Sequence, residues 1–284
     1  MENNELTLDA LLPPQMAAKA EQIGVKKAHS GPITLFVLAV LAGAFIALGA
    51  IFATTVVAGA GGALPYGVTR LLAGLVFSLG LILVIVGGAE LFTGNNLIVM
   101  AWAGGKVSTA LLLRNWLVVY LGNFVGSVGT AGLVFVSGQY AFGGGAVGAA
   151  ALATANAKVN LGFVQAIALG VLCNALVCLA VWLTFSARTT TDRVLAIVPP
   201  IAAFVAAGFE HSIANMYFVP VGLFIKAGAP AAFWQAAGLE AASFASLTWG
   251  RFLVNNLLPV TLGNILGGTV LVGAVYWFVY LRQA

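Results

Sequence analysis

The chain has 284 residues, of which 61% are hydrophobic and only 7% are charged, with a formal net charge of +4. A soluble domain carries about 25% charged residues, so this composition excludes an ordinary water-soluble protein. The long apolar stretches lack the alternation of an outer-membrane barrel strand, and we therefore expect membrane-spanning helices. Glycine is abundant, at 35 residues, and small residues allow such helices to pack closely.

The first 30 residues are polar and amphipathic, and no cleavable signal peptide is visible in them. Leu8, Leu11, Leu12 and Met16 fall at helical spacing, which predicts a short cytoplasmic helix over 6–27. Six apolar runs follow, and we expect them to form six spans of one channel domain over 31–284. Their approximate ranges are 33–58, 68–101, 111–137, 161–186, 194–225 and 252–281.

The basic residues between the runs predict an orientation. Eight Lys and Arg residues fall on the side of both termini, against four on the other side, which are Arg70, Lys158, Lys226 and Arg251. Cytoplasmic loops carry the excess of positive charge. We therefore expect a multi-pass protein of the bacterial inner membrane with both termini in the cytoplasm.

The second and fifth runs are longer than one crossing needs, because about 20 residues span the hydrocarbon core. Each has a polar interruption, GGAELFTGNN over 87–96 and AGFEHSIANMYF over 207–218. Unwound backbone at membrane depth is tolerated only where protein buries it or where it lines a wet cavity. These interruptions therefore predict two broken helices beside a permeation path.

The two interruptions also match each other as an internal repeat. GxExxxxN occurs at 88–95 and 208–215, and LGN occurs at 121–123 and 262–264. Each half then contains three spans, and because three is odd the second half is inserted upside down. We expect an all-α fold with a 3+3 inverted repeat, whose halves cover about 31–137 and 161–281, with broken second and fifth helices meeting near the midplane.

Glu90, Glu210 and His211 are the ionisable candidates at the interruptions of the predicted spans, where such groups are energetically costly and are functional by default. Glu90 and Glu210 occupy equivalent repeat positions, and we favour a scaffold role at the helix breaks because fixed negative charge repels an anion. His211 aligns with Leu91, so the repeat does not require it, and we favour a permeation role over that of a buried hydrogen-bonding residue. Lys158 is open to two interpretations, a topology residue or an attractor of anions.

For the other candidate residues, the sequence alone favours a packing role. Cys173 and Cys178 diverge around one helix at about 100° per residue, so neither a disulfide nor a metal site is expected. Phe77, Leu81 and Phe204 are of the types that usually face lipid or the core of a membrane helix.

Together these motifs resemble the formate/nitrite transporter family, and the bacterial formate channels most closely. The resemblance rests on GGAELFTGNN, LGNFVGS, a Cys-Asn pair in the fourth span, GFEHSIANMYF and LGNILGG. It implies an aquaporin-like protomer within a homopentamer, with a pore in each protomer and no cofactor. It also implies a central His211 facing Thr93, and a polar surround of Lys158, Asn174, Asn215 and Asn264.

The resemblance further implies two apolar constrictions. Leu81 and Phe204, with Phe77 nearby, match the cytoplasmic one, and Leu91 matches the periplasmic one. Moving an unpaired carboxylate-sized ion from water into a low-dielectric medium costs on the order of 20 kcal/mol, so these apolar constrictions block hydrated ions. A weak-acid anion that takes a proton from His211 could cross neutral.

Several functions remain open at this point. Formate is the favoured small anion, whereas nitrite and hydrosulfide passages share most of these residues, and a channel is not separated from a proton symporter. A neutral-solute channel of the aquaporin type is an alternative, although its paired Asn-Pro-Ala motifs are absent. An enzyme is not expected, since no second His, paired Asp or nucleophile motif accompanies Glu210 and His211.

Overall fold

The structure is a computed structural model that describes residues 10–61 and 63–282, and over these residues it contains helices and no strand. The principal helices are α1 (Pro13–Ala28), α2 (Pro32–Val57), α3 (Tyr66–Gly87), α4 (Phe92–Asn95), α5 (Val99–Ala103), α6 (Thr109–Val136), α7 (Ala146–Val159), α8 (Phe163–Ser186), α9 (Thr190–Ala206), α10 (Ser212–Gly228), α11 (Ala231–Ala237), α12 (Trp249–Arg251), α13 (Leu258–Leu266) and α14 (Val275–Tyr280). Short 3₁₀ segments are Asn96–Ile98, Gln139–Ala141 and Ala241–Phe244, and π-helical turns cover Phe252–Leu257 and Gly267–Ala274.

The six expected spans are present as α2, α3 with α4 and α5, α6, α8, α9 with α10, and α12 to α14. Five helical stretches are long and apolar enough to cross a membrane, or six when the sharply bent pair α10 and α11 is counted as one. The helices α9 and α10 have 17 residues each, because the fifth run is divided in the middle as predicted.

Both predicted breaks follow a glycine with a left-handed backbone. Gly88 ends α3 with φ +80°, and Gly208 follows α9 with φ +78°. Residues with a Cβ rarely adopt this conformation, so glycine sets where each helix stops. After each break the chain is extended for a few residues, and a new helix starts at Phe92 and at Ser212.

Two helices were not predicted from the sequence. The first is α7, an Ala-rich helix of 14 residues that follows three consecutive left-handed glycines at Gly143–Gly145. It is too short to span the membrane, and its region contains no apolar run that predicts a span. The second is α11, which sits at the end of the sharply bent pair with α10.

Helix contacts show that the second half is inverted relative to the first. Along α3 and α9 the neighbours run in opposite directions, because Gly74 lies against Ala202 and Ser78 against Val198. The pair α2 and α6 runs parallel, and so does the pair α8 and α13. The same close contact recurs in both pairs, between a glycine and the carbonyl of a valine, at Val40 with Gly126 and at Val171 with Gly267.

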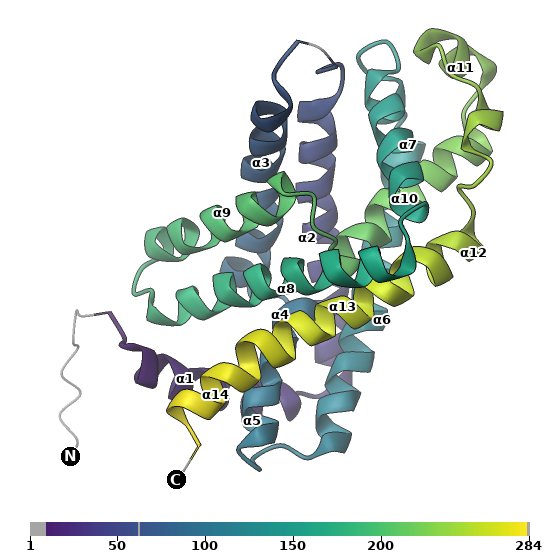
Figure 1. The fold of residues 1–284 in the computed structure, drawn as a ribbon. Helices are drawn as coiled ribbons and strands as arrows, with labels where there is room; N and C mark the ends of the chain where they lie inside the picture. The colour runs from purple at the N-terminus through teal and green to yellow at the C-terminus, as the bar shows by residue number, and fades with distance from the viewer. Residues whose placement is uncertain (1–9, 62, 283–284) are drawn as a thin grey trace.

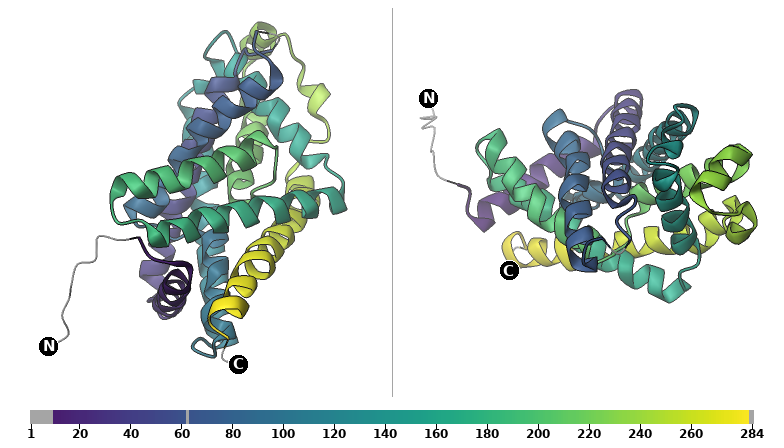
Figure 2. Two further views of the ribbon diagram at one scale, coloured as in Figure 1. Left: turned by 60° about the vertical axis from the view of Figure 1, so that its left-hand side comes forward. Right: turned by 90° about the horizontal axis from the view of Figure 1, so that it is seen from above.

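The helix α1 packs against the bundle at one end of the molecule, beside α14, whereas α7 and α11 lie at the opposite end (Figure 1). The two views in Figure 2 agree on this arrangement. Met16, Ala17 and Ala20 of α1 are buried in a cluster with Met100 and Trp182. The predicted amphipathic segment is therefore helical from Pro13; residues 10–12 precede the helix, and the earlier part with Leu8 lies outside the described residues.

Candidate functional site

The first break is held by an asparagine from the third span. Asn123 accepts a hydrogen bond from the backbone N–H of Phe92 (2.9 Å) and donates to the carbonyls of Ala39 (2.7 Å) and Glu90 (2.9 Å). The N–H of Glu90 donates to the carbonyl of Leu38 (3.2 Å). One buried amide thus satisfies the backbone groups that the break leaves unpaired.

The second break repeats this pattern with Asn264. Its side chain accepts from the N–H of Ser212 (2.9 Å) and donates to the carbonyls of Gly170 (2.8 Å) and Glu210 (2.9 Å). The N–H of Glu210 donates to the carbonyl of Leu169 (3.3 Å). Asn264 is fully buried and lines neither cavity described below, so it supports the backbone of the path.

Each break also carries an ion pair. Lys27 of α1 lies 2.8 Å from Glu90, and Lys158 of α7 lies 2.7 Å from Glu210. The amides of Asn95 and Asn215 donate to the same glutamates, at 2.8 and 2.7 Å. Hydrogen bonds to the remaining lone pairs are what make a buried ion pair tolerable. This geometry supports the scaffold reading of both glutamates.

Two cavities approach the breaks from opposite ends. The α7-side cavity has a volume of about 90 Å³ and the α1-side cavity one of about 290 Å³. The first is lined by Arg70, Phe77, Lys158, Phe204, His211 and Asn215, among others. The second is lined by Lys19, Lys27, Leu81, Glu90, Leu91 and Arg193, among others. Burial, followed by the charges of Arg193 and Arg188, lowers the pKa of Lys19 below its usual range.

The predicted constriction residues are divided between the two cavities. Phe77 and Phe204 line the α7-side cavity, while Leu81 and Leu91 line the α1-side cavity. The cause is the antiparallel course of α3 and α9, which brings the end of α9 beside the earlier part of α3. The rings of Phe77 and Phe204 meet edge to face, with centroids 5.7 Å apart.

His211 caps the start of α10 with its own ring. Nδ1 accepts a hydrogen bond from the backbone N–H of Ala214 (3.0 Å), and Nε2 lies 3.1 Å from Oγ1 of Thr93. Because a backbone N–H only donates, Nδ1 must present its lone pair, and the neutral ring carries its hydrogen on Nε2. The ring is buried and lies against Phe204. His211 therefore offers one donor, directed toward the loop of the first break.

Asn174 connects the two halves from α8. Its amide donates to the carbonyls of Thr93 (3.3 Å) and Asn264 (2.7 Å) and to Oδ1 of Asn96 (2.7 Å). Thr93 also accepts a hydrogen bond at its carbonyl from Cys178 (3.3 Å). Thr93 and Asn174 are fully buried and line neither cavity, so they fix the loop that His211 faces.

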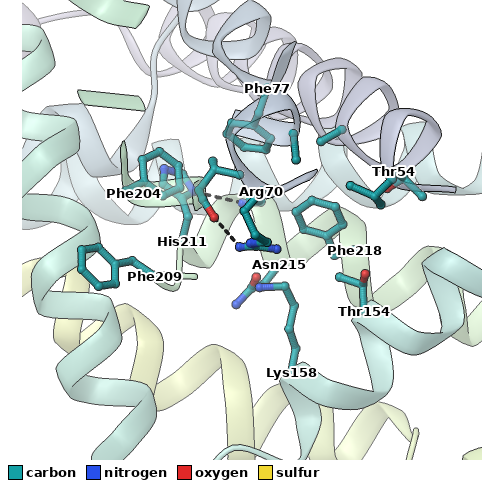
Figure 3. A pocket seen from close by; sticks show the side chains of 15 residues that line it. Thr54, Arg70, Phe77, Thr154, Lys158, Phe204, Phe209, His211, Asn215 and Phe218 are labelled. Atoms are coloured by element: carbon teal, nitrogen blue, oxygen red, sulfur yellow. Dashed lines mark hydrogen bonds between the residues drawn. The ribbon is translucent and has the colours of Figure 1, made fainter. Parts of the chain in front are cut away.

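Arg70 is a cavity residue that the sequence did not single out. It points into the α7-side cavity (Figure 3) and donates to the carbonyls of Ala206 (3.3 Å) and Val205 at the end of α9. A helix C-terminus carries partial negative charge, which this guanidinium offsets. Within the described residues Arg70 has no carboxylate partner, whereas Lys158 has one. In the sequence Arg70 counts only among the basic residues that predict the orientation, and no motif surrounds it.

A model of the formate/nitrite transporter family matches residues 14–278 of the chain. The chain belongs to the formate/nitrite transporter family. It is 46% identical over 275 residues to the formate channel FocA of Escherichia coli K12, with 97% of this chain and 96% of that protein covered. It is 43% identical over 272 residues to the FocA of Haemophilus influenzae, with 96% and 95% covered.

Solved structures of formate/nitrite transporter proteins agree with the fold. A pentameric formate channel with formate bound matches with a TM-score of 0.84 and 50% identity, covering 88% of this chain and 98% of its own. An ion channel of the same family matches with a TM-score of 0.77 and 31% identity, covering 93% and 98%. The inverted repeat with two broken helices is thus the formate/nitrite transporter fold, and the chain is an integral membrane protein.

Proposed function

We propose that this protein passes formate across the bacterial inner membrane, through a pore in each protomer of a homopentamer. The observation that carries the proposal is the pair of cavities at opposite ends of the molecule, each lined by cations, one of which reaches the buried His211. Its relatives named formate channels and the pentameric channel with formate bound support formate as the permeant and the pentamer as the assembly. Both termini lie in the cytoplasm in this proposal, following the basic residues.

The apolar residues between the cavities provide selectivity. Narrow apolar constrictions dewet and oppose a hydrated ion. A weak acid passes such a barrier when it is neutral, because most of the desolvation cost falls on the charge. The cations of the two cavities concentrate the anion at either mouth, and protonation by solvent converts it into the form that crosses.

His211 acts in this proposal as a neutral hydrogen-bond donor through Nε2. The sequence had suggested that it gives its proton to formate. With Nδ1 occupied by the N–H of Ala214, loss of the Nε2 proton would leave a ring without any proton. The geometry therefore favours a donor that orients the permeant beside Thr93 and keeps its own proton.

The proposed function is tested in liposomes containing the purified protein. We expect uptake of formate well above that of empty vesicles, and above the uptake of nitrite, hydrosulfide and water at equal driving force. Faster uptake of nitrite or hydrosulfide would reassign the permeant within the family. Transport of water with no anion uptake would overturn the anion passage altogether.

The role of His211 is tested with His211→Asn. Asparagine also caps helix N-termini, so α10 keeps its start. Losing one neutral hydrogen bond to the permeant should slow formate uptake on the order of fivefold, with an unchanged dependence on external pH. The measurement is formate uptake and release across external pH for both proteins. A variant that loses the pH-dependent component in one direction would show that His211 does supply the proton.

A further inference from the structure

The last turn of α9 carries Phe204, one of the two aromatic rings at the α7-side cavity. The ring is almost fully buried. It meets Phe77 edge to face and lies against the ring of His211, with centroids 5.7 and 5.8 Å away. The place of the Phe204 ring, and with it the gap between the two phenyl rings, therefore depends on what holds the last turn of α9.

The helix α9 holds its own last turn weakly. Two consecutive prolines, Pro199 and Pro200, lie inside the helix just before this turn. A proline has no N–H, so each one removes a backbone hydrogen bond from the helix interior. The carbonyls of Leu195 and Ala196, four residues earlier, lose these donors. The equivalent helix of the first half, α3, contains no proline and keeps these bonds along its length.

Arg70 of α3 holds the end of α9 from outside the helix. Its Nε donates to the carbonyl of Ala206 (3.3 Å), and its Nη2 donates to the carbonyl of Val205 (Figure 3). Among the described residues, the carbonyl of Ala206 accepts no other hydrogen bond. One planar guanidinium thus fixes the two carbonyls that directly follow Phe204, which a single ammonium could not do in the same geometry.

The same face of α3 carries Arg70 and one ring of the constriction. Arg70 and Phe77 lie seven residues apart, which is two helical turns, so both face α9. Between them Gly74 lets the two helices approach closely, because a Cβ there would lie 2.5 Å from the carbonyl oxygen of Ala202. One helix therefore presents the Phe77 ring and also fixes the backbone beside Phe204.

The first half of the molecule has an arginine in the corresponding place but no such contact. Arg193 lies near the start of α9, as Arg70 lies near the start of α3, and it lines the α1-side cavity with Ile85 and Gly88 at the end of α3. Within the part of the chain that the structure describes, the guanidinium of Arg193 makes no hydrogen bond. The arginine is bonded only at the helix that prolines weaken, which indicates a structural purpose for the contact of Arg70.

We propose that Arg70 is a positioning residue for the aromatic constriction. By bonding the carbonyls of Val205 and Ala206, it keeps the ring of Phe204 against Phe77 and thereby sets the size limit for the permeant. The proposal rests on the proposed formate passage and deepens it, because it assigns size selectivity to an arginine outside the aromatic pair.

The test is the ratio of acetate to formate uptake by liposomes. Both anions carry one charge, so the attraction of a cation cancels in the ratio. We expect Arg70→Met to raise the ratio about threefold, which is part of the roughly tenfold that exclusion of one methyl group can supply. In the Phe204→Ala background the same change should leave the ratio unaltered, because two residues that act through one ring are not additive. Arg70→Lys keeps the charge and can bond one carbonyl, so it should raise the ratio by a smaller factor.

Lys226 provides the matched control. It is a cation predicted for the same side of the membrane, donates to the carbonyl of Leu247 (2.9 Å), and lines neither cavity. Lys226→Met removes the same charge and a backbone contact, and it should leave the ratio unchanged. An equal rise in Lys226→Met would refute the positioning role. An unchanged ratio in both Arg70 variants, or equal rises with and without the Phe204 ring, would also refute it. Absence of formate uptake by the wild-type protein would refute the proposed function itself, and this role with it.

Discussion

Phe77 and Phe204 form the aromatic contact at the α7-side cavity, and their size should limit what passes. Phe204→Ala removes one ring and leaves the other without its edge-to-face partner. We expect the variant to admit acetate and to raise osmotic water flow, because a wider apolar constriction dewets less readily. Acetate uptake and liposome shrinkage measure this. Unchanged selectivity would place Phe204 outside the path.

A matched control comes from the same helix. Leu195 of α9 is 66% exposed and faces away from both cavities. Leu195→Ala deletes a similar apolar group without touching the path, and we expect it to leave the acetate to formate ratio unchanged.

Residue roles were predictable where the repeat or the family motif marked them. The contact between His211 and Thr93 and the scaffold role of the glutamates were expected from the motifs. The sequence did not single out Lys27, Asn115 or Asn256. Asn115 accepts from Asn95 (2.9 Å) as Asn256 accepts from Asn215 (2.8 Å), and the alignment of the two LGN motifs also pairs Asn115 with Asn256. Local sequence cannot show that Lys158 faces Glu210, because that contact joins α7 to the break through the fold alone.

At the scale of elements, closely packed glycines join the helices of each half. A Cβ on Gly126 would collide with the carbonyl of Val40, whereas on Gly132 it would meet only the ring of Phe224 at 3.9 Å. We expect Gly126→Ala to destabilise the protein by about 2 kcal/mol through overpacking. Gly132→Ala in the same helix should be neutral or stabilising, since alanine favours helix.

Thermal unfolding of the two alanine variants in detergent tests this pair. The expected order of melting temperatures is Gly126→Ala lowest and Gly132→Ala at or above the wild type. The opposite order would show that the contact between α2 and α6 yields easily.

The sequence predicted long apolar helices well and short or less apolar helices poorly. The six runs and both breaks follow from hydropathy and from the polar interruptions, and their ends fall within a few residues of the helices. By contrast, α7 and the π-helical turns of the last span carry no such signal. The helix α7 forms because its Ala-rich segment packs on α10, and the π-helical turns depend on the contacts that the sixth span makes with its neighbours.

At the scale of the whole molecule, a single chain leaves many large apolar side chains exposed, including Leu133, Val136, Val164, Val254 and Val270. Lipid and neighbouring protomers would cover such a surface in the proposed pentamer. If its five pores work independently, mixed pentamers with one inactive protomer should keep about four-fifths of the wild-type flux. Formate uptake by purified mixed assemblies measures this fraction. Near-complete loss of flux would indicate one shared path or strict coupling.

The side chains that hold each helix break have a consequence for how the chain folds during synthesis. Lys27 and Asn123 at the first break lie before residue 124, and Lys158, Asn256 and Asn264 at the second lie after residue 157. The glycine-rich connection at Gly143–Gly145 falls between the two sets. A chain divided there would carry into each fragment the asparagine and the ion pair of its own break, whereas Arg70, which bonds the end of α9, would stay with the first fragment. Each half thus brings the asparagine and the ion pair of its own break, and the contacts of Thr93 with His211 and Asn174 form only when the two halves meet.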